Sequence, residues 1–174
     1  MSLENAKENL KEFGKELGLE GLEFDENNTC ILGIDDEFSL HITYEPNSKR
    51  LYLYSPLLDG LPSDDKTRLK LFTKLLEGSM LGGQMAGGGV GVAVKEELIL
   101  IHCTIDMEHA LPSALRAFAP LYVETVEKWR RICADICAGR EPSEDVGPGA
   151  GRPGAKEAPK TGGGGQPGQG FIKI

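Results

Sequence analysis

Residues 37–44, EFSLHITY, alternate strictly between polar and apolar side chains, and this alternation constrains the fold more than any other feature of the chain. A period of two places the apolar side chains on one face of a β-strand. The neighbouring segments TCILGI (29–34) and RLYLYS (50–55) are also rich in strand-forming residues. Asp35-Asp36 and Pro46-Asn47-Ser48 separate the three segments with residue types that favour tight turns. We therefore predict a three-stranded antiparallel meander.

Segments with helical periodicity precede and follow this meander. Apolar side chains recur at spacings of three and four in residues 3–17, which predicts an amphipathic helix capped at its start by Ser2 and ended by Gly18. A second helix is predicted over 63–77, capped at its start by Ser63 and ended by Gly78. A third runs from about 108 to 138, with Pro120 expected to kink it.

The segments VGVAV (90–94) and LILIHCTI (98–105) flank Lys95-Glu96-Glu97 and predict a hairpin. The order is then helix, three strands, helix, two strands, helix. Because strands do not alternate with helices, we predict an α+β domain over 1–138, a twisted antiparallel sheet packed by helices, rather than a parallel α/β fold. Residues 139–174 are rich in glycine and proline and predict a disordered tail that ends in Phe171-Ile172-Lys173-Ile174.

The charge of the chain argues against some partners. The formal net charge is −8, and residues 139–174 hold five basic and four acidic side chains, so residues 1–138 carry about −9. Such a surface repels nucleic acid and anionic membranes and would hasten the capture of a basic protein segment. No apolar run is long enough to span a bilayer and the N-terminus lacks a secretory signal, so we expect a cytoplasmic protein.

The glycine-rich stretch GGQMAGGGVGVAV (82–94) raises the question of nucleotide binding. A dinucleotide-binding loop follows a strand and opens a helix, whereas this stretch follows a predicted helix and opens a strand. The lysine of a P-loop is also missing. Ser63-Asp64-Asp65-Lys66 has the Ser-x-x-Lys spacing of penicillin-recognising enzymes, which also carry a Ser-Asp-Asn and a Lys-Thr-Gly motif. No Ser-Asp-Asn is present here, and the one Lys-Thr-Gly, at residues 160–162, falls in the tail. We find no catalytic constellation and expect no enzymatic activity and no cofactor.

The four cysteines do not form a metal-binding pattern. Cys133 and Cys137 would share one face of the third helix, but a structural zinc site needs four ligands, and no second Cys or His pair has suitable spacing. We therefore expect no metal and interpret all four, including Cys30 and Cys103, as small buried side chains.

Two strands carry more apolar surface than one sheet face requires. Residues 50–54 are apolar or aromatic on both faces, as are residues 98–105. Large uncovered apolar patches usually mark interfaces. The apolar residues of these two strands, taken together, therefore favour a homodimer contact or a peptide-binding surface. The alternative, that all of these side chains lie inside the core, stays open at this point.

The pattern resembles the class I type III secretion chaperones, the Tir-chaperone-like family. The likeness covers about residues 3–138 and is carried by FDENNTCILGIDDEFSLHITYEPNSKRLYLYSPLLDGLP, by KLLEGSMLGGQMAGGGVGVAVKEELILIHC and by the long helix with Trp129. Among its branches, the sequence is most similar to the chlamydial one. The resemblance implies an acidic bacterial cytoplasmic homodimer, without enzymatic activity, that binds the N-terminal segment of a secreted effector as an extended chain. It would keep the effector secretion-competent and deliver it to the export ATPase.

The resemblance also implies site residues. The dimer contact would form from the second helix and the following strand, at Leu69, Phe72, Leu75, Leu76, Val90, Val92 and Val94. Effectors would bind at Leu10, Phe13, Leu17, Cys30, Leu32, Leu51 and Leu53, to which the apolar character of the strand adds Tyr52 and Tyr54. In the family, effectors lie over apolar grooves beside the first helix and the sheet. The glycine- and proline-rich tail departs from the family pattern, and its last residues could cover the groove of the chain itself. A dimeric adaptor that binds folded partners is the alternative function.

Overall fold

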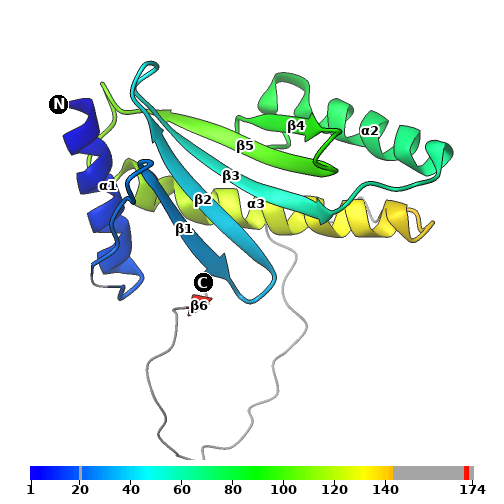
Figure 1. The fold of residues 1–174 in the computed structure, drawn as a ribbon, viewed down its shortest axis with the longest axis horizontal. Helices are drawn as coiled ribbons and strands as arrows, with labels where there is room; N and C mark the ends of the chain where they lie inside the picture. Colours follow the sequence, from blue (N-terminus) through cyan, green and yellow to red (C-terminus); the bar gives the residue numbers. More distant parts are fainter. Residues whose placement is uncertain (20, 143–170, 173–174) are drawn as a thin grey trace, which may run out of the picture.

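The computed structural model describes residues 1–19, 21–142 and 171–172 (Figure 1). The elements follow the predicted order, with one short 3-10 turn and one further strand added. They are α1 (Ser2–Glu16), β1 (Thr29–Ile34), β2 (Phe38–Glu45), β3 (Arg50–Asp59), α2 (Asp65–Ser79), η1 (Met80–Gly82), β4 (Gly89–Ala93), β5 (Leu98–Asp106), α3 (Ala114–Cys137) and β6 (Phe171–Ile172).

All strands belong to one sheet in the order β4-β5-β3-β2-β1-β6. The meander β1-β2-β3 and the hairpin β4-β5 are both antiparallel, as predicted, and β5 joins the two by pairing antiparallel with β3. The turn between β1 and β2 consists of Asp35 and Asp36, both with positive φ, and Glu37 donates its N–H to the carbonyl of Ile34 at 2.8 Å. Two consecutive residues in this conformation form the turn that best matches strand twist.

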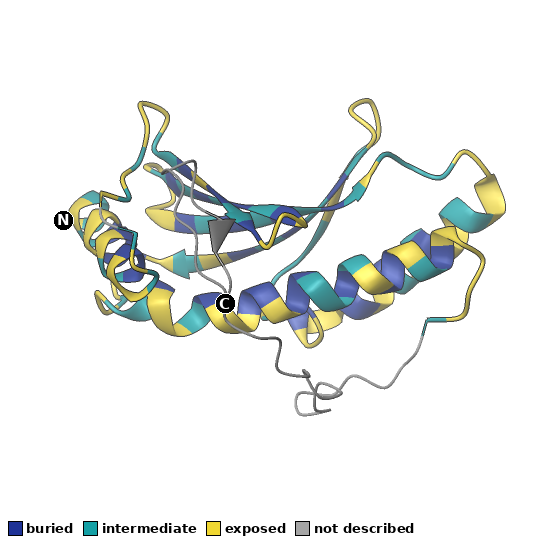
Figure 2. Cartoon of the chain, turned by 90° about the horizontal axis from the view of Figure 1, so that it is seen from below, coloured by how far each residue is buried: buried dark blue, intermediate teal, exposed yellow. Residues whose placement is uncertain are grey.

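The core lies between one face of the sheet and α3, which crosses that face (Figures 1 and 2). Leu40, Ile42, Leu51, Leu53 and Ile101 on the strands are fully buried, as are Leu115, Tyr122, Val126, Trp129 and Cys133 on α3. Along β2 and β3 every second residue is buried and its neighbours are half-buried. The predicted alternation is therefore confirmed, and the face opposite α3 stays accessible.

Asn9 joins α1 to the start of α3. Its side chain is fully buried, its Oδ1 accepts the N–H of Leu115 at 2.9 Å, and its Nδ2 donates to the carbonyl of Leu111 at 3.1 Å. The first of these bonds satisfies an N–H group that a helix N-terminus leaves unpaired. The helix begins at Ala114, later than the predicted 108, and Pro112 lies before it.

Two helix caps predicted from the sequence are wrong. Met1, not Ser2, is the N-cap of α1, and the Ser2 hydroxyl lies 2.7 Å from that of Tyr44. The N-cap of α2 is Asp64, whose carboxylate accepts the N–H of Thr67 at 2.8 Å, so Ser63 lies outside the helix. Gly18, with φ +68°, follows α1 as predicted.

Gly78 does not end α2 but lies in its last turn, against α3. A Cβ on Gly78 would be 2.2 Å from the Trp129 ring, closer than real contacts allow. The indole N–H of Trp129 donates to the carbonyl of Gln84 at 2.8 Å, which ties α3 to the connection that follows α2. A glycine is needed here for close packing, not for helix termination.

The glycine-rich stretch is the connection from α2 to β4. A Cβ on Gly88 would be 1.8 Å from the carbonyl oxygen of His102 on β5, and one on Gly82 would be 2.7 Å from Gly87. Glycines are therefore needed at these two positions because the backbone packs closely there.

The third strand is longer than predicted and continues through Pro56 to Asp59. The last pair between β3 and β2 is Tyr54 with His41, and a register shift occurs between Pro56 and Leu58 on the β5 side. Pro56 has no N–H to donate to the sheet, and it is tolerated because the strand pairing is irregular at this position.

Residues 143–170, the greater part of the predicted tail, lie outside the described residues. Phe171–Ile172 pair in parallel with Gly33–Ile34 of β1. No helix within the described ranges is long and apolar enough to cross a membrane.

Candidate binding surfaces

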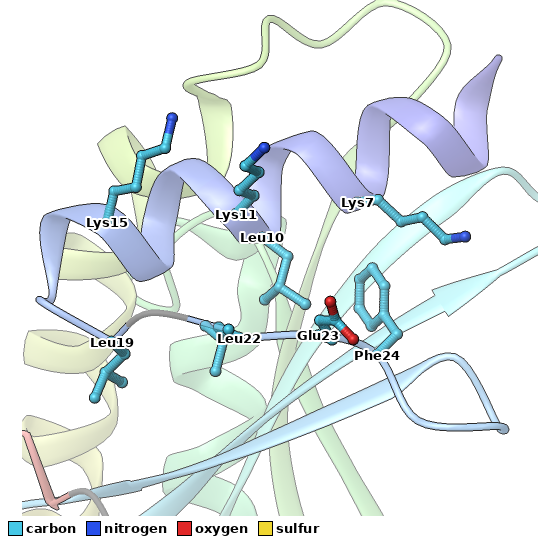
Figure 3. A pocket seen from close by; sticks show the side chains of 9 residues that line it. Lys7, Leu10, Lys11, Lys15, Leu19, Leu22, Glu23 and Phe24 are labelled. Atoms are coloured by element: carbon cyan, nitrogen blue, oxygen red, sulfur yellow. The ribbon is translucent and has the colours of Figure 1, made fainter.

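An open groove lies between α1 and the segment that follows it. Its volume is about 610 Å³, and its apolar lining consists of Leu10, Leu19, Leu22 and Phe24 (Figure 3). Leu10 is almost fully buried at the base, whereas the other three are half-buried. Sites of this size that are mostly apolar with a few polar groups commonly hold ligands.

Gly14 makes this groove possible. A Cβ at Gly14 would lie 2.9 Å from the carbonyl oxygen of Leu19 and 3.0 Å from Leu22. The N–H of Leu19 donates to the Gly14 carbonyl at 2.9 Å, so the segment folds back directly onto α1. Sequence reasoning missed Leu19, Leu22 and Phe24, although the glycines at 14, 18 and 21 marked a chain reversal at this place.

A second surface is the sheet face opposite α3. Tyr54 stacks on His41 with ring centroids 4.9 Å apart, and its hydroxyl lies 3.3 Å from that of Thr43. Partial burial lowers the pKa of His41, so its imidazole is neutral at physiological pH. Tyr52 pairs with Thr43 on β2 and Thr104 on β5. The face therefore presents aromatic rings and hydroxyl groups rather than charges.

The residues predicted to bind effectors do not share one surface. Tyr52 and Tyr54 lie half-buried on the open sheet face, and Leu17 is half-buried at the end of α1. The others lie in the core, with exposed fractions of 6% or less: Leu10, Phe13, Cys30, Leu32, Leu51 and Leu53. Of these six, Leu10 also lines the groove. Contact with an effector at these positions stays a prediction.

A third surface is an exposed apolar patch along α2, η1 and β4. The exposed fractions are 68% for Leu69, 67% for Leu76, 72% for Met80, 100% for Leu81 and 65% for Val94. Val92 is also exposed, and Phe72 and Val90 are half-buried. Of the residues predicted at a dimer contact, Leu75 alone is fully buried, in the packing of α2 on the core. Patches of this kind usually mark interaction sites.

The free edge of β1 forms a fourth surface, which β6 partly occupies. Gly33 pairs with Phe171 and Ile34 with Ile172, in parallel register. Ile31, 58% exposed, lies two residues before the paired stretch. An open strand edge offers unpaired backbone groups that an extended peptide can bind.

No constellation for nucleophilic or metal chemistry appears in the described ranges. No group of three or more His, Cys, Asp or Glu side chains there could hold a metal ion. Burial raises the pKa of the Cys103 and Cys133 thiols to about 12 and that of Cys30 to about 11, so none of them is a ready nucleophile. Cys137 is exposed, which corrects the prediction that all four cysteines are buried.

Comparison with known proteins gives a consistent result. The model of the Tir chaperone protein (CesT) family matches residues 8–130. A chain from the HopA1–SchA chaperone–effector complex is similar at a TM-score of 0.59 and 25% identity, over 75% of this chain and 96% of that one. No curated protein is significantly similar to this chain.

Two further solved structures share the fold. A chain from the ExsC–ExsE complex has a TM-score of 0.62 at 17% identity, over 75% of this chain and 94% of that one. A chain from the structure of the Yersinia pestis type III secretion chaperone SycH in complex with a stable fragment of YscM2 has a TM-score of 0.54 at 16% identity. The similarity covers 71% of this chain and 98% of that one.

Proposed function

The chain belongs to the Tir chaperone protein (CesT) family, and from this premise we propose that it is a type III secretion chaperone that binds the N-terminal segment of secreted effectors as an extended chain. The observation that carries the proposal is the family match over residues 8–130, together with the likeness to a chain from a chaperone–effector complex. Binding would keep the effector soluble and secretion-competent and direct it to the export apparatus, including its ATPase. Such a role places the protein in the bacterial cytoplasm.

The surfaces described above suit this function. An extended segment can add to the edge of β1 through main-chain hydrogen bonds and place alternate side chains in apolar depressions. Half-exposed Leu17, Tyr52 and Tyr54 offer such contacts, as do Leu19, Leu22 and Phe24 in the groove. None of these contacts requires a cofactor.

Co-purification tests the function directly. The tagged chain is isolated from its native host, bound proteins are identified, and the N-terminal segment of each is titrated against the purified chain. We expect saturable binding of an N-terminal segment and no binding of the remainder of the same protein. If the partners bind only as folded domains, the chain is an adaptor and the proposal fails.

We also propose that the chain is a homodimer through the exposed apolar patch of α2 and β4. Burying one large apolar side chain is worth about 1.5–3 kcal/mol, and Leu69, Leu76 and Val94 are each at least 65% exposed in the single chain. Leu76→Glu is expected to convert a dimer to a monomer in multi-angle light scattering. Leu121→Glu, at a position 53% exposed on α3, is the matched control and should leave the dimer intact. A wild-type monomer at micromolar concentration would contradict the proposal.

A further inference from the structure

The lining of the groove beside α1 differs in charge from the rest of the domain. Among the described residues, Lys7, Lys11 and Lys15 line it together with one carboxylate, that of Glu23 (Figure 3). Residues 1–138 carry a formal charge of about −9, so a locally basic surface is unexpected.

The spacing of the lysines in α1 produces this local charge. Positions 7, 11 and 15 are four apart and share one face of the helix, next to Leu10. The glutamates at 4, 8, 12 and 16 have the same spacing and form a neighbouring stripe, but none of them lines the groove. The basic stripe therefore borders the groove although α1 holds both signs of charge.

The three lysines differ in their ion pairing. Within the described ranges, no carboxylate lies within 4.0 Å of the ammonium group of Lys7 or Lys11, whereas Lys15 pairs with Glu12 at 2.5 Å. All three lysines are exposed. Their stems line the groove, and in Figure 3 the ammonium groups of Lys11 and Lys15 point away from its apolar floor toward solvent. A bound segment would therefore meet apolar side chains at the floor and positive charge at the rim.

We propose that this groove selects a peptide segment whose apolar anchor residues are flanked by acidic side chains. This inference rests on the proposed function and specifies the chemistry of the partner at that site. The apolar anchors would pack on Leu10, Leu22 and Phe24, and the acidic groups would pair with Lys7 and Lys11. At physiological ionic strength charges are screened over about 8 Å, so acidic groups on distant parts of the domain act weakly on a segment in contact with the lysines at the rim.

The experiment uses two fluorescent peptides and the full chain. Both peptides carry the same three apolar residues at alternate positions; glutamates flank these residues in one peptide and lysines in the other. We expect the acidic peptide to bind about tenfold more tightly by fluorescence anisotropy, since a few exposed ion pairs supply a difference of this order. Raising the salt from about 0.05 to 0.5 M should reduce the preference to about twofold.

Charge reversal at the groove supplies the decisive comparison. The double variant Lys7→Glu, Lys11→Glu should lose the preference or invert it. The control variant Lys66→Glu, Arg131→Glu makes the same change in net charge at exposed sites outside the groove. It should retain the preference for the acidic peptide. Circular dichroism and the unfolding midpoint of both variants verify that the fold is intact.

The inference would be overturned by binding of neither peptide, by tighter binding of the basic peptide by the wild type, or by an equal effect of the two double variants. Displacement of the acidic peptide by dodecanoate at comparable concentration would also overturn it, because the groove would then be a site for anionic amphiphiles. None of these results affects the co-purification of an effector, so failure of the inference is distinguishable from failure of the proposed function.

Discussion

Replacing Gly78 with alanine tests whether the contact between α2 and α3 sets the stability of the chain. The added methyl group would lie 2.2 Å from two carbon atoms of the Trp129 ring, whereas real contacts of this kind are not shorter than 3.0 Å. The ring cannot move away freely, because it is fully buried and its N–H is bonded to the Gln84 carbonyl at 2.8 Å. Relief of the contact therefore requires α2 itself to shift by about 1 Å, which disturbs close packing.

Two effects of opposite sign decide the magnitude. Alanine is favoured over glycine inside a helix by about 1 kcal/mol. Overpacking a well-filled core costs about 1–3 kcal/mol, and a contact this short belongs at the upper end of that range. We expect a net loss of about 1–2 kcal/mol in the free energy of unfolding.

Urea denaturation at one fixed protein concentration measures this loss. Trp129 is the single tryptophan of the chain, so its fluorescence reports the contact and the unfolding transition together. Gly83→Ala is the control, because its Cβ would meet only the Met80 carbonyl oxygen at 3.8 Å and its φ is −60°. If Gly78→Ala were as stable as the wild type or more stable, the steric argument would be refuted.

Three further predictions concern other parts of the molecule. Asn9→Ala leaves the N–H of Leu115 buried without a partner and should cost about 2–3 kcal/mol in urea denaturation; a loss under about 0.5 kcal/mol would contradict the capping role. Ellman's reagent should modify one thiol quickly in the native protein, that of Cys137, and Cys137→Ser should remove this phase; two fast thiols in the wild type would be inconsistent with the burial described. Deleting residues 162–174 removes β6 from the β1 edge and should tighten binding of an effector segment about two- to tenfold, as expected when an internal competitor occupies the site; unchanged affinity would show that β6 does not compete.

Local periodicity predicted the elements and the pairing within the meander and within the hairpin, because these depend on residues close in sequence. It did not predict that β5 pairs with β3. The alternation at Leu51, Tyr52, Leu53 and Tyr54 assigned these side chains correctly to two faces. It could not show which face α3 covers, since that depends on packing between distant segments. Leu51 and Leu53, which the family resemblance placed at an effector contact, lie on the covered face and are fully buried.

The errors at helix ends have a similar origin. Gly78 is of a residue type that often ends a helix. A glycine is needed there because the ring of Trp129, which is distant in sequence, leaves no room for a Cβ. The start of α3 depends on Asn9, which is supplied by α1. The groove residues of the segment after α1 were missed because the floor joins a helix to an irregular segment, and no single period describes both. The glycines at 14, 18 and 21 and the spacing of Lys7, Lys11 and Lys15 were the available signals.

The central place of β3 has a consequence for how the chain folds. Its pairing with β2 is local, but its pairing with β5 joins Arg50 to Asp106 across all of α2 and β4. Pairings of such long range form slowly. During synthesis, the meander is therefore made before β5 and α3. Until these two elements have formed, one edge of β3 is unpaired and the side chains of Leu51 and Leu53 are exposed to water. A nascent chain in this condition is prone to aggregation, so a protein proposed to keep effectors soluble would itself depend on rapid completion of its last helix.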